Sequence, residues 1–168
     1  MADKLRRIQA HHANCLGCGP DNPGNLGLSF TLDHDARRVS SDVVLDRRHE
    51  GAPGFAHGGA VATALDDTIG TLLVVLEQPA VTAKLEVNYR RPAFLGRPYA
   101  VEAWCERIEG RKLHLAAELR DEGEVVADAK ALFLAVSLEH FLQGSDRLPT
   151  GWREYWGPPP DEKPRLPY

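Results

Sequence analysis

The pattern of apolar and polar residues changes along the chain from alternation to a long apolar run and back to alternation. Apolar residues recur at every second position over 26–32 and 39–45, and again over 81–90, 100–108, 112–120 and 124–136. A period of two residues is typical of β-strands. Between these groups, residues 58–76 are small or apolar at almost every position, which predicts one buried helix that ends near Gln78-Pro79.

Turn-forming residues separate the predicted strands. Residues 33–36 join the first two strands as a hairpin, and Asp121-Glu122-Gly123 joins the last two. Two strands, one long helix and four strands in an antiparallel run predict an α+β domain. We expect the helix to lie along the concave face of a curved sheet, with solvent or another subunit on the opposite face.

Composition divides the chain into three parts. Residues 1–25 are a polar leader that contains the sequence Cys15-x-x-Cys18, residues 26–142 are the folded domain, and residues 143–168 are a proline-rich tail. The prolines disfavour regular structure, so we expect an extended tail that the fold does not require. Trp152, Tyr155 and Trp156 are the residues that could attach this tail to the domain.

Length and charge exclude several classes of protein. A chain of 168 residues can bury one ordinary core, and its formal charge of −4 argues against nucleic acid or an anionic membrane as the main partner. No stretch resembles a membrane span of about 20 apolar residues, and the first residues lack the apolar core of a signal peptide. Three cysteines, an odd number, suit a reducing compartment, so we expect a cytoplasmic protein.

Two adjacent carboxylates, Asp66 and Asp67, lie in the middle of the predicted buried helix. Burying an unpaired carboxylate is costly, so at least one of them must be solvated, paired or used in chemistry. A structural, hydrogen-bonded Asp66 is the alternative, but the apolar surroundings favour a functional one. Asp67 points about 100° further around the helix, and we interpret it as a supporting or interface residue.

A histidine and two glycines, His57-Gly58-Gly59, come directly before the apolar run. The free N–H groups at a helix N-terminus can receive the negative charge that develops on a carbonyl oxygen during acyl transfer. Glycines at this place let the backbone approach a substrate closely. The alternative is that His57 only caps the helix.

Three motifs together closely resemble the hotdog-fold acyl-CoA thioesterases of the PaaI-like group. They are residues 50–59 with the His-Gly-Gly, Asp66 nine positions after His57, and residues 82–93 with Tyr89-x-x-Pro-Ala. The resemblance covers about 24–136 and includes the order of the elements. It implies a hotdog fold that hydrolyses an acyl thioester to a free acid and a thiol, without metal or organic cofactor.

The resemblance also implies roles for single positions. Asp66 would be the nucleophile or the general base, a backbone N–H of His57-Gly58-Gly59 would polarise the thioester carbonyl, and Thr82 would help to place the water. The residues implied to contact coenzyme A are Asn88, Arg90, Arg91, Arg111 and Lys112, and a solvated basic surface is the alternative for the charged ones. The acyl group would be carried by coenzyme A or by acyl carrier protein. Relatives form homodimers with sites at the interface, often paired again as tetramers.

Other functions remain open at this point. A hotdog protein that binds acyl thioesters without hydrolysis, or a hotdog enoyl-thioester hydratase or dehydratase, would use similar residues. Cys15-x-x-Cys18 is half of a zinc site, which His11, His12 or Cys105 could complete only if folding brings them near. We expect a tight turn with small buried thiols and no metal, and a zinc-dependent binding module is the third alternative.

Overall fold

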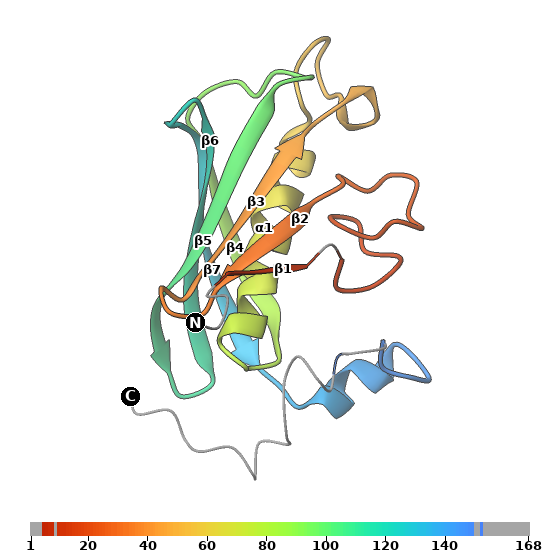
Figure 1. The fold of residues 1–168 in the computed structure, drawn as a ribbon, viewed down its shortest axis with the longest axis vertical. Helices are drawn as coiled ribbons and strands as arrows, with labels where there is room; N and C mark the ends of the chain where they lie inside the picture. Colours follow the sequence, from red (N-terminus) through yellow and green to blue (C-terminus); the bar gives the residue numbers. More distant parts are fainter. Residues whose placement is uncertain (1–4, 9, 150–151, 153–168) are drawn as a thin grey trace.

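A single antiparallel sheet curves around one long helix in the computed structural model, which describes residues 5–8, 10–149 and 152 (Figure 1). The elements are β1 (Leu5–Ile8), β2 (Ser29–Asp33), β3 (Arg38–Val44), the 3-10 helix η1 (Arg47–His49), α1 (Gly58–Val75), β4 (Ala80–Tyr89), β5 (Pro98–Glu109), β6 (Lys112–Asp121), β7 (Glu124–Ala135) and η2 (Leu138–Gln143). The seven strands lie in the order β1-β2-β3-β5-β6-β7-β4. The predicted α+β architecture is therefore confirmed.

The alternating segments form the strands that the sequence predicts. β2 and β3 pair as an antiparallel hairpin, and β6 pairs with β7 through the predicted turn. Glu122 and Gly123 in that turn have φ values of 48° and 88°, as the two central residues of a type I′ turn require. The sequence analysis did not predict β1, which lies in the polar leader and pairs with β2 at the edge of the sheet.

Helix α1 buries one face against the sheet and leaves a narrow stripe partly exposed. Its buried residues include Val61, Ala64, Leu65, Thr68, Ile69 and Leu72, and it contacts every strand from β2 to β7. The partly exposed positions Gly59, Ala62, Thr63, Asp66 and Gly70 follow the spacing of a single helical face. The predicted packing of the helix against the sheet is therefore confirmed, and the stripe stays partly exposed in the single chain.

By length and composition, α1 is the one helix among the described residues that could cross a membrane, and 56% of it is buried inside the fold. The sequence analysis expected no such stretch. A buried core helix has the same length and composition, so this similarity is weak evidence for a membrane span. The two buried polar side chains of α1, Thr68 and Thr71, are both hydrogen-bonded: the Thr68 hydroxyl lies 3.0 Å from that of Ser41 on β3, and the Thr71 hydroxyl donates to the Asp67 carbonyl at 2.9 Å.

Strand β4 forms one edge of the sheet, and a β-bulge divides it into two parts. Among the described strands, β4 pairs only with β7, and the register shifts between Thr82 and Lys84. The bulge reverses the inward and outward positions, so Thr82 lies opposite the buried Phe133, on the helix side of the sheet. Strict alternation along residues 81–90 would place Thr82 on the outer face with Lys84, Glu86, Asn88 and Arg90, and the bulge overturns this expectation.

Trp152 connects the tail to the domain. Its side chain is 9% exposed and packs with Leu138, Phe141 and Leu148, and its Nε1–H donates to the carbonyl of His11 at 2.9 Å. The other two predicted anchors, Tyr155 and Trp156, and most of the tail lie outside the described residues. The predicted limits of the domain, at residues 26 and 142, are not tested by this contact.

We expect Trp152→Ala to lower the free energy of unfolding by about 1–3 kcal/mol, because it deletes a buried aromatic ring and leaves the His11 carbonyl without this donor. Urea unfolding followed by circular dichroism measures the change. Leu142→Ala is the matched control, since Leu142 is 41% exposed on η2, the 3-10 helix that Trp152 packs against. Equal stability of the Trp152 variant and the control would show that this contact does not stabilise the fold.

Candidate functional site

Asp66 and Thr82 form a polar pair between the middle of α1 and the start of β4. The Thr82 hydroxyl donates a hydrogen bond of 3.2 Å to Asp66 Oδ1. Burial raises the pKa of Asp66 above its usual range; the Thr82 hydrogen bond opposes this effect, and the nearby Cys15 adds to it. The bulge in β4 is what places Thr82 on this side of the sheet. The sequence analysis selected both residues, and the structure brings them together.

The N-terminus of α1 forms a second polar feature. His57 is the N-cap, and its Nδ1 accepts the N–H of Gly59 at 2.8 Å. A Cβ atom on Gly59 would lie 2.9 Å from this Nδ1, so the cap requires glycine there. The carbonyl of His57 accepts the N–H groups of Ala60 and Val61. The Gly58 N–H, in contrast, has no acceptor among the described residues. Capping of the helix by His57 is therefore observed, and Gly58 supplies the available donor.

A cavity of about 410 Å³ opens beside this helix N-terminus. Its lining includes Gly58, Val61 and Tyr89, together with Arg90 and Arg91 from the end of β4. The Tyr89 hydroxyl donates to the Gly58 carbonyl at 2.7 Å and so fixes the tyrosine against the helix. The cavity thus combines a free backbone N–H, apolar walls and two guanidinium groups.

The predicted coenzyme A ligands do not form one cluster within the chain. Asn88 and Arg90 both contact Asp128 near the end of β4, and Arg91 pairs with Glu124 at 3.0 Å. Arg111, which donates to the Ala135 carbonyl, and Lys112 lie at the opposite end of the sheet, where Lys112 and Val81 both pair with Leu134. The length of β4 separates the two groups by about 30 Å.

The two polar features are also separated along α1. Asp66 lies eight residues after Gly58, a rise of about 12 Å, although both belong to the partly exposed side of the helix. A reacting carbonyl must lie about 3 Å from both its hydrogen-bond donor and the attacking group. One chain therefore holds two separate candidate half-sites, the first with Gly58, Tyr89, Arg90 and Arg91 and the second with Asp66 and Thr82.

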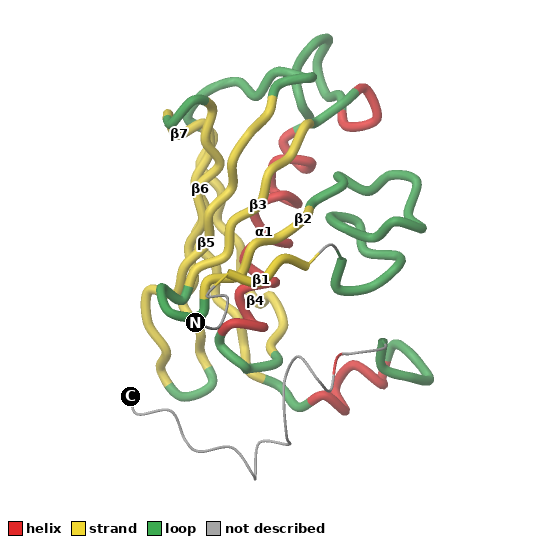
Figure 2. The backbone as a smooth tube through the Cα atoms, viewed as in Figure 1, coloured by secondary structure: helices red, strands yellow, loops and turns green. Residues whose placement is uncertain are grey.

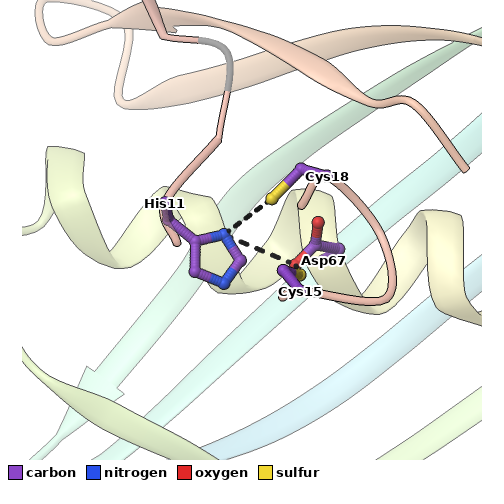
Figure 3. Close-up of side chains that lie close together, drawn as sticks. All are labelled: His11, Cys15, Cys18 and Asp67. Carbon is purple, nitrogen blue, oxygen red and sulfur yellow. Dashed lines mark hydrogen bonds and ion pairs between the residues drawn. The ribbon is translucent and has the colours of Figure 1, made fainter. Parts of the chain in front are cut away.

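Asp67 points to the other side of the helix and meets the leader (Figure 3). Its Oδ1 lies 3.3 Å from Cys15 Sγ and 3.7 Å from His11 Nδ1, and Cys18 Sγ lies 3.1 Å from the same His11 nitrogen. His11 is the histidine, of the candidates named from the sequence, that folding brings to the Cys-x-x-Cys. Asp67 could not be predicted as a member from the sequence, because no local spacing connects it to the leader.

The four side chains of this cluster perturb one another strongly. Burial raises the pKa of Asp67 to about 7. The hydrogen bond from Cys18 holds the pKa of Cys15 well below its usual range, despite burial. Burial lowers the pKa of His11, but the hydrogen bond with Cys15 and the charge of Asp67 outweigh it and raise that pKa overall. The hydrogen bond with Cys15 raises the pKa of Cys18, so the cluster favours the charged forms of Cys15 and His11 and the neutral forms of Cys18 and Asp67.

A seven-stranded antiparallel sheet wrapped around one central helix, with polar groups at the helix N-terminus and midpoint, defines a hotdog domain. Residues 53–127 match the family described as the thioesterase superfamily. The matched residues lie within the domain, and this match agrees with the resemblance of its motifs to the hotdog-fold thioesterases.

Known proteins of similar sequence and structure agree with this assignment. The acyl-coenzyme A thioesterase THEM4 of Xenopus laevis is 40% identical over 87 residues, which are 51% of this chain and 39% of that protein. A thioesterase superfamily protein of known crystal structure has 28% sequence identity and a TM-score of 0.68, over 73% of this chain and 60% of that one.

A phenylacetic acid degradation-related protein from Ralstonia eutropha JMP134 has 27% sequence identity and a TM-score of 0.62, over 68% of this chain and 89% of that one. The chain spans about two fifths of the length of the curated relatives it matches.

Proposed function

We propose that this protein is an acyl-CoA thioesterase that hydrolyses an acyl thioester to the free acid and the thiol. The observation that carries the proposal is the Asp66–Thr82 pair on the partly exposed stripe of α1. The name of the THEM4 relative, acyl-coenzyme A thioesterase, supports the same reaction and carrier.

The half-sites divide the chemistry between them. Asp66 acts as the nucleophile or as the general base for water, and the Thr82 hydroxyl orients its carboxylate. The Gly58 N–H at the positive end of the helix dipole stabilises the oxyanion of the tetrahedral intermediate. Arg90 and Arg91 at the mouth of the cavity suit the phosphates of coenzyme A. On binding, the phosphates replace Asp128 and Glu124 as the partners of these two guanidinium groups.

A two-fold pairing of β4 with its copy completes the site. If two β4 edges pair antiparallel, the start of one strand lies beside the end of the other. That arrangement places Asp66 and Thr82 of one subunit near Gly58 and Tyr89 of the second. It also brings Arg111 and Lys112 of one subunit toward Arg90 and Arg91 of the other, so the basic residues converge on one substrate.

We expect the protein in solution to be a homodimer or a dimer of dimers that buries more than roughly 1,000 Å² in the β4 interface. The exposed β4 edge and the uncovered stripe of α1 are the surfaces that require a partner. Multi-angle light scattering at micromolar concentration measures the mass directly. A monodisperse monomer with full activity would exclude this assembly and the shared site.

A hydrolysis screen tests the proposed reaction. Release of free thiol is measured for acyl-CoAs of increasing chain length and for aromatic acyl-CoAs, and then for the preferred acyl groups on acyl carrier protein. Hydrolysis above the rate of the protein-free reaction supports the proposal. Binding without thiol release would favour a non-hydrolytic binding protein, and hydration of an enoyl-CoA would favour a hydratase.

The cysteines support a cytoplasmic location for this activity. Cys15, Cys18 and Cys105 are free thiols in the structure. Thiols persist where glutathione and thioredoxin keep proteins reduced.

A further inference from the structure

The segment between β1 and β2 is held in a compact shape with almost no regular structure (Figure 2). Turns connect it internally, as in the bonds from the Gly19 N–H to the Cys15 carbonyl and from the Asp21 N–H to the Ala13 carbonyl. Loops of this length inside a domain are uncommon unless something fixes them. Two of its few buried side chains are the thiols of Cys15 and Cys18.

These thiols converge with His11 and Asp67 on one point. The four potential ligand atoms all lie within 4.8 Å of one another, and Cys18 Sγ lies 3.1 Å from His11 Nδ1. In a tetrahedral zinc site with bonds of about 2.0–2.3 Å, neighbouring ligand atoms are about 3.3–3.8 Å apart. The leader supplies three of the four ligands and α1 supplies the fourth, Asp67 (Figure 3).

One atom in the cluster has no partner. Asp67 Oδ2 is buried and accepts no hydrogen bond among the described residues, whereas Oδ1 contacts both Cys15 and His11. A buried carboxylate oxygen without a donor is costly. A cation bound at the cluster would satisfy this oxygen and balance the negative charge of the carboxylate and the thiolates.

The backbone around the thiols is shaped for this arrangement. The Gly17 N–H donates to Cys15 Sγ at 3.3 Å, which stabilises a thiolate. A Cβ on Gly17 would lie 2.1 Å from Asp67 Oδ2, and one on Gly19 would lie 2.2 Å from the Cys15 nitrogen. Only glycine at both positions lets the loop bring its sulfur atoms down to the helix.

We propose that His11, Cys15, Cys18 and Asp67 bind a Zn²⁺ ion that fastens the leader to α1. A set of two thiolates, one imidazole and one carboxylate binds zinc in preference to magnesium or calcium. Magnesium and calcium favour sites in which all ligands are oxygen atoms. Four protein ligands leave no open position, so this zinc is structural and takes no direct part in hydrolysis. It fixes the leader against α1 at Asp67, about 100° around the helix from the Asp66 that binds Thr82.

Metal analysis of the full-length protein tests the site without reference to its activity. The protein is purified under reducing conditions with an affinity tag that binds no metal, and its zinc is measured by mass spectrometry. We expect about one zinc per chain, and replacement with Co²⁺ should give thiolate-to-metal charge-transfer absorption and the d–d bands of a tetrahedral site. Removal of the metal by a chelator should lower the melting temperature by several degrees.

Two pairs of matched variants locate the ligands. Cys18→Ser and His11→Ala should lose most of the zinc and the charge-transfer band. Cys105→Ser and His12→Ala should keep both, because Cys105 lies on β5 and His12 accepts the Asn14 N–H instead. If the first pair does not fold, the zinc content and the cobalt spectrum of the native protein still decide.

Two results would overturn the proposal. One is a native protein that neither contains zinc nor binds Zn²⁺ or Co²⁺ with the expected spectrum. The other is a Cys15–Cys18 disulfide in protein that is alkylated at cell lysis and purified without reductant, detected by intact mass. Neither result would affect the hydrolysis screen, so this site and the proposed reaction fail or stand separately.

Discussion

Asp66→Asn is expected to lower kcat by a factor of about 10² or more while coenzyme A thioesters still bind. The substitution keeps the shape of the side chain but removes the negative charge that attack on a carbonyl or activation of water requires. The Thr82 hydroxyl can still donate to the asparagine oxygen, so the geometry of the pair should survive. The free energy of unfolding should hold or rise, because a partly buried charge is removed.

The measurement combines steady-state hydrolysis with isothermal titration of a non-hydrolysable thioester analogue. Asp42→Asn is the control for loss of one negative charge, since Asp42 lies exposed on β3. Full activity of Asp66→Asn would remove Asp66 from the catalytic assignment. A loss of binding equal to the loss of turnover would instead make Asp66 a structural residue.

The neighbouring carboxylate should respond in a different way. Asp67→Asn changes a residue that contacts Cys15 and His11 and has no contact with Thr82. It should therefore affect the attachment of the leader much more than the rate of the chemical step. Similar kinetic losses in both variants would show that the two carboxylates act as one unit.

The sequence predicts most of the fold because its strands and helix each bury one side. In a strand such as β6, Leu113, Leu115 and Leu119 alternate with outward residues, and this period alone identifies the element. The short strand β1 has no such pattern, with three of its four residues exposed. It forms only because β2 offers an unpaired edge, and that information is not local.

Part of the site, like most of the fold, can be predicted from the sequence. The rest of the site depends on tertiary geometry. His57, Gly58 and Asp66 lie on one helix, so their order and spacing are visible in the chain itself. The bulge at Ala83 is not visible, yet it decides that Thr82 faces Asp66. The link from Asp67 to Cys15 joins residues 52 positions apart, and only folding reveals it.

Gly58→Pro tests the proposed oxyanion donor directly, because it removes the backbone N–H of residue 58. Gly58 is the first residue of α1, where proline is well tolerated because its fixed φ suits the helix. The preceding His57 has φ −61° and ψ 136°, a conformation that a following proline permits. The variant lacks the N–H and adds ring atoms, of which the Cβ lies 3.3 Å from the Tyr89 hydroxyl, and it should lose about 10²–10³ in kcat. Gly58→Ala, which keeps the N–H, should retain most of the activity.

A mixture of two inactive variants then tests the shared site. Asp66→Asn and Gly58→Pro damage different half-sites, so a mixed dimer would contain one site with both defects and one intact site. When the two proteins are unfolded together and refolded in equal amounts, half of the dimers are mixed, and about a quarter of the native activity should return. If Gly58 and Asp66 of the same chain served one substrate, every site would carry a defect and mixing would restore nothing.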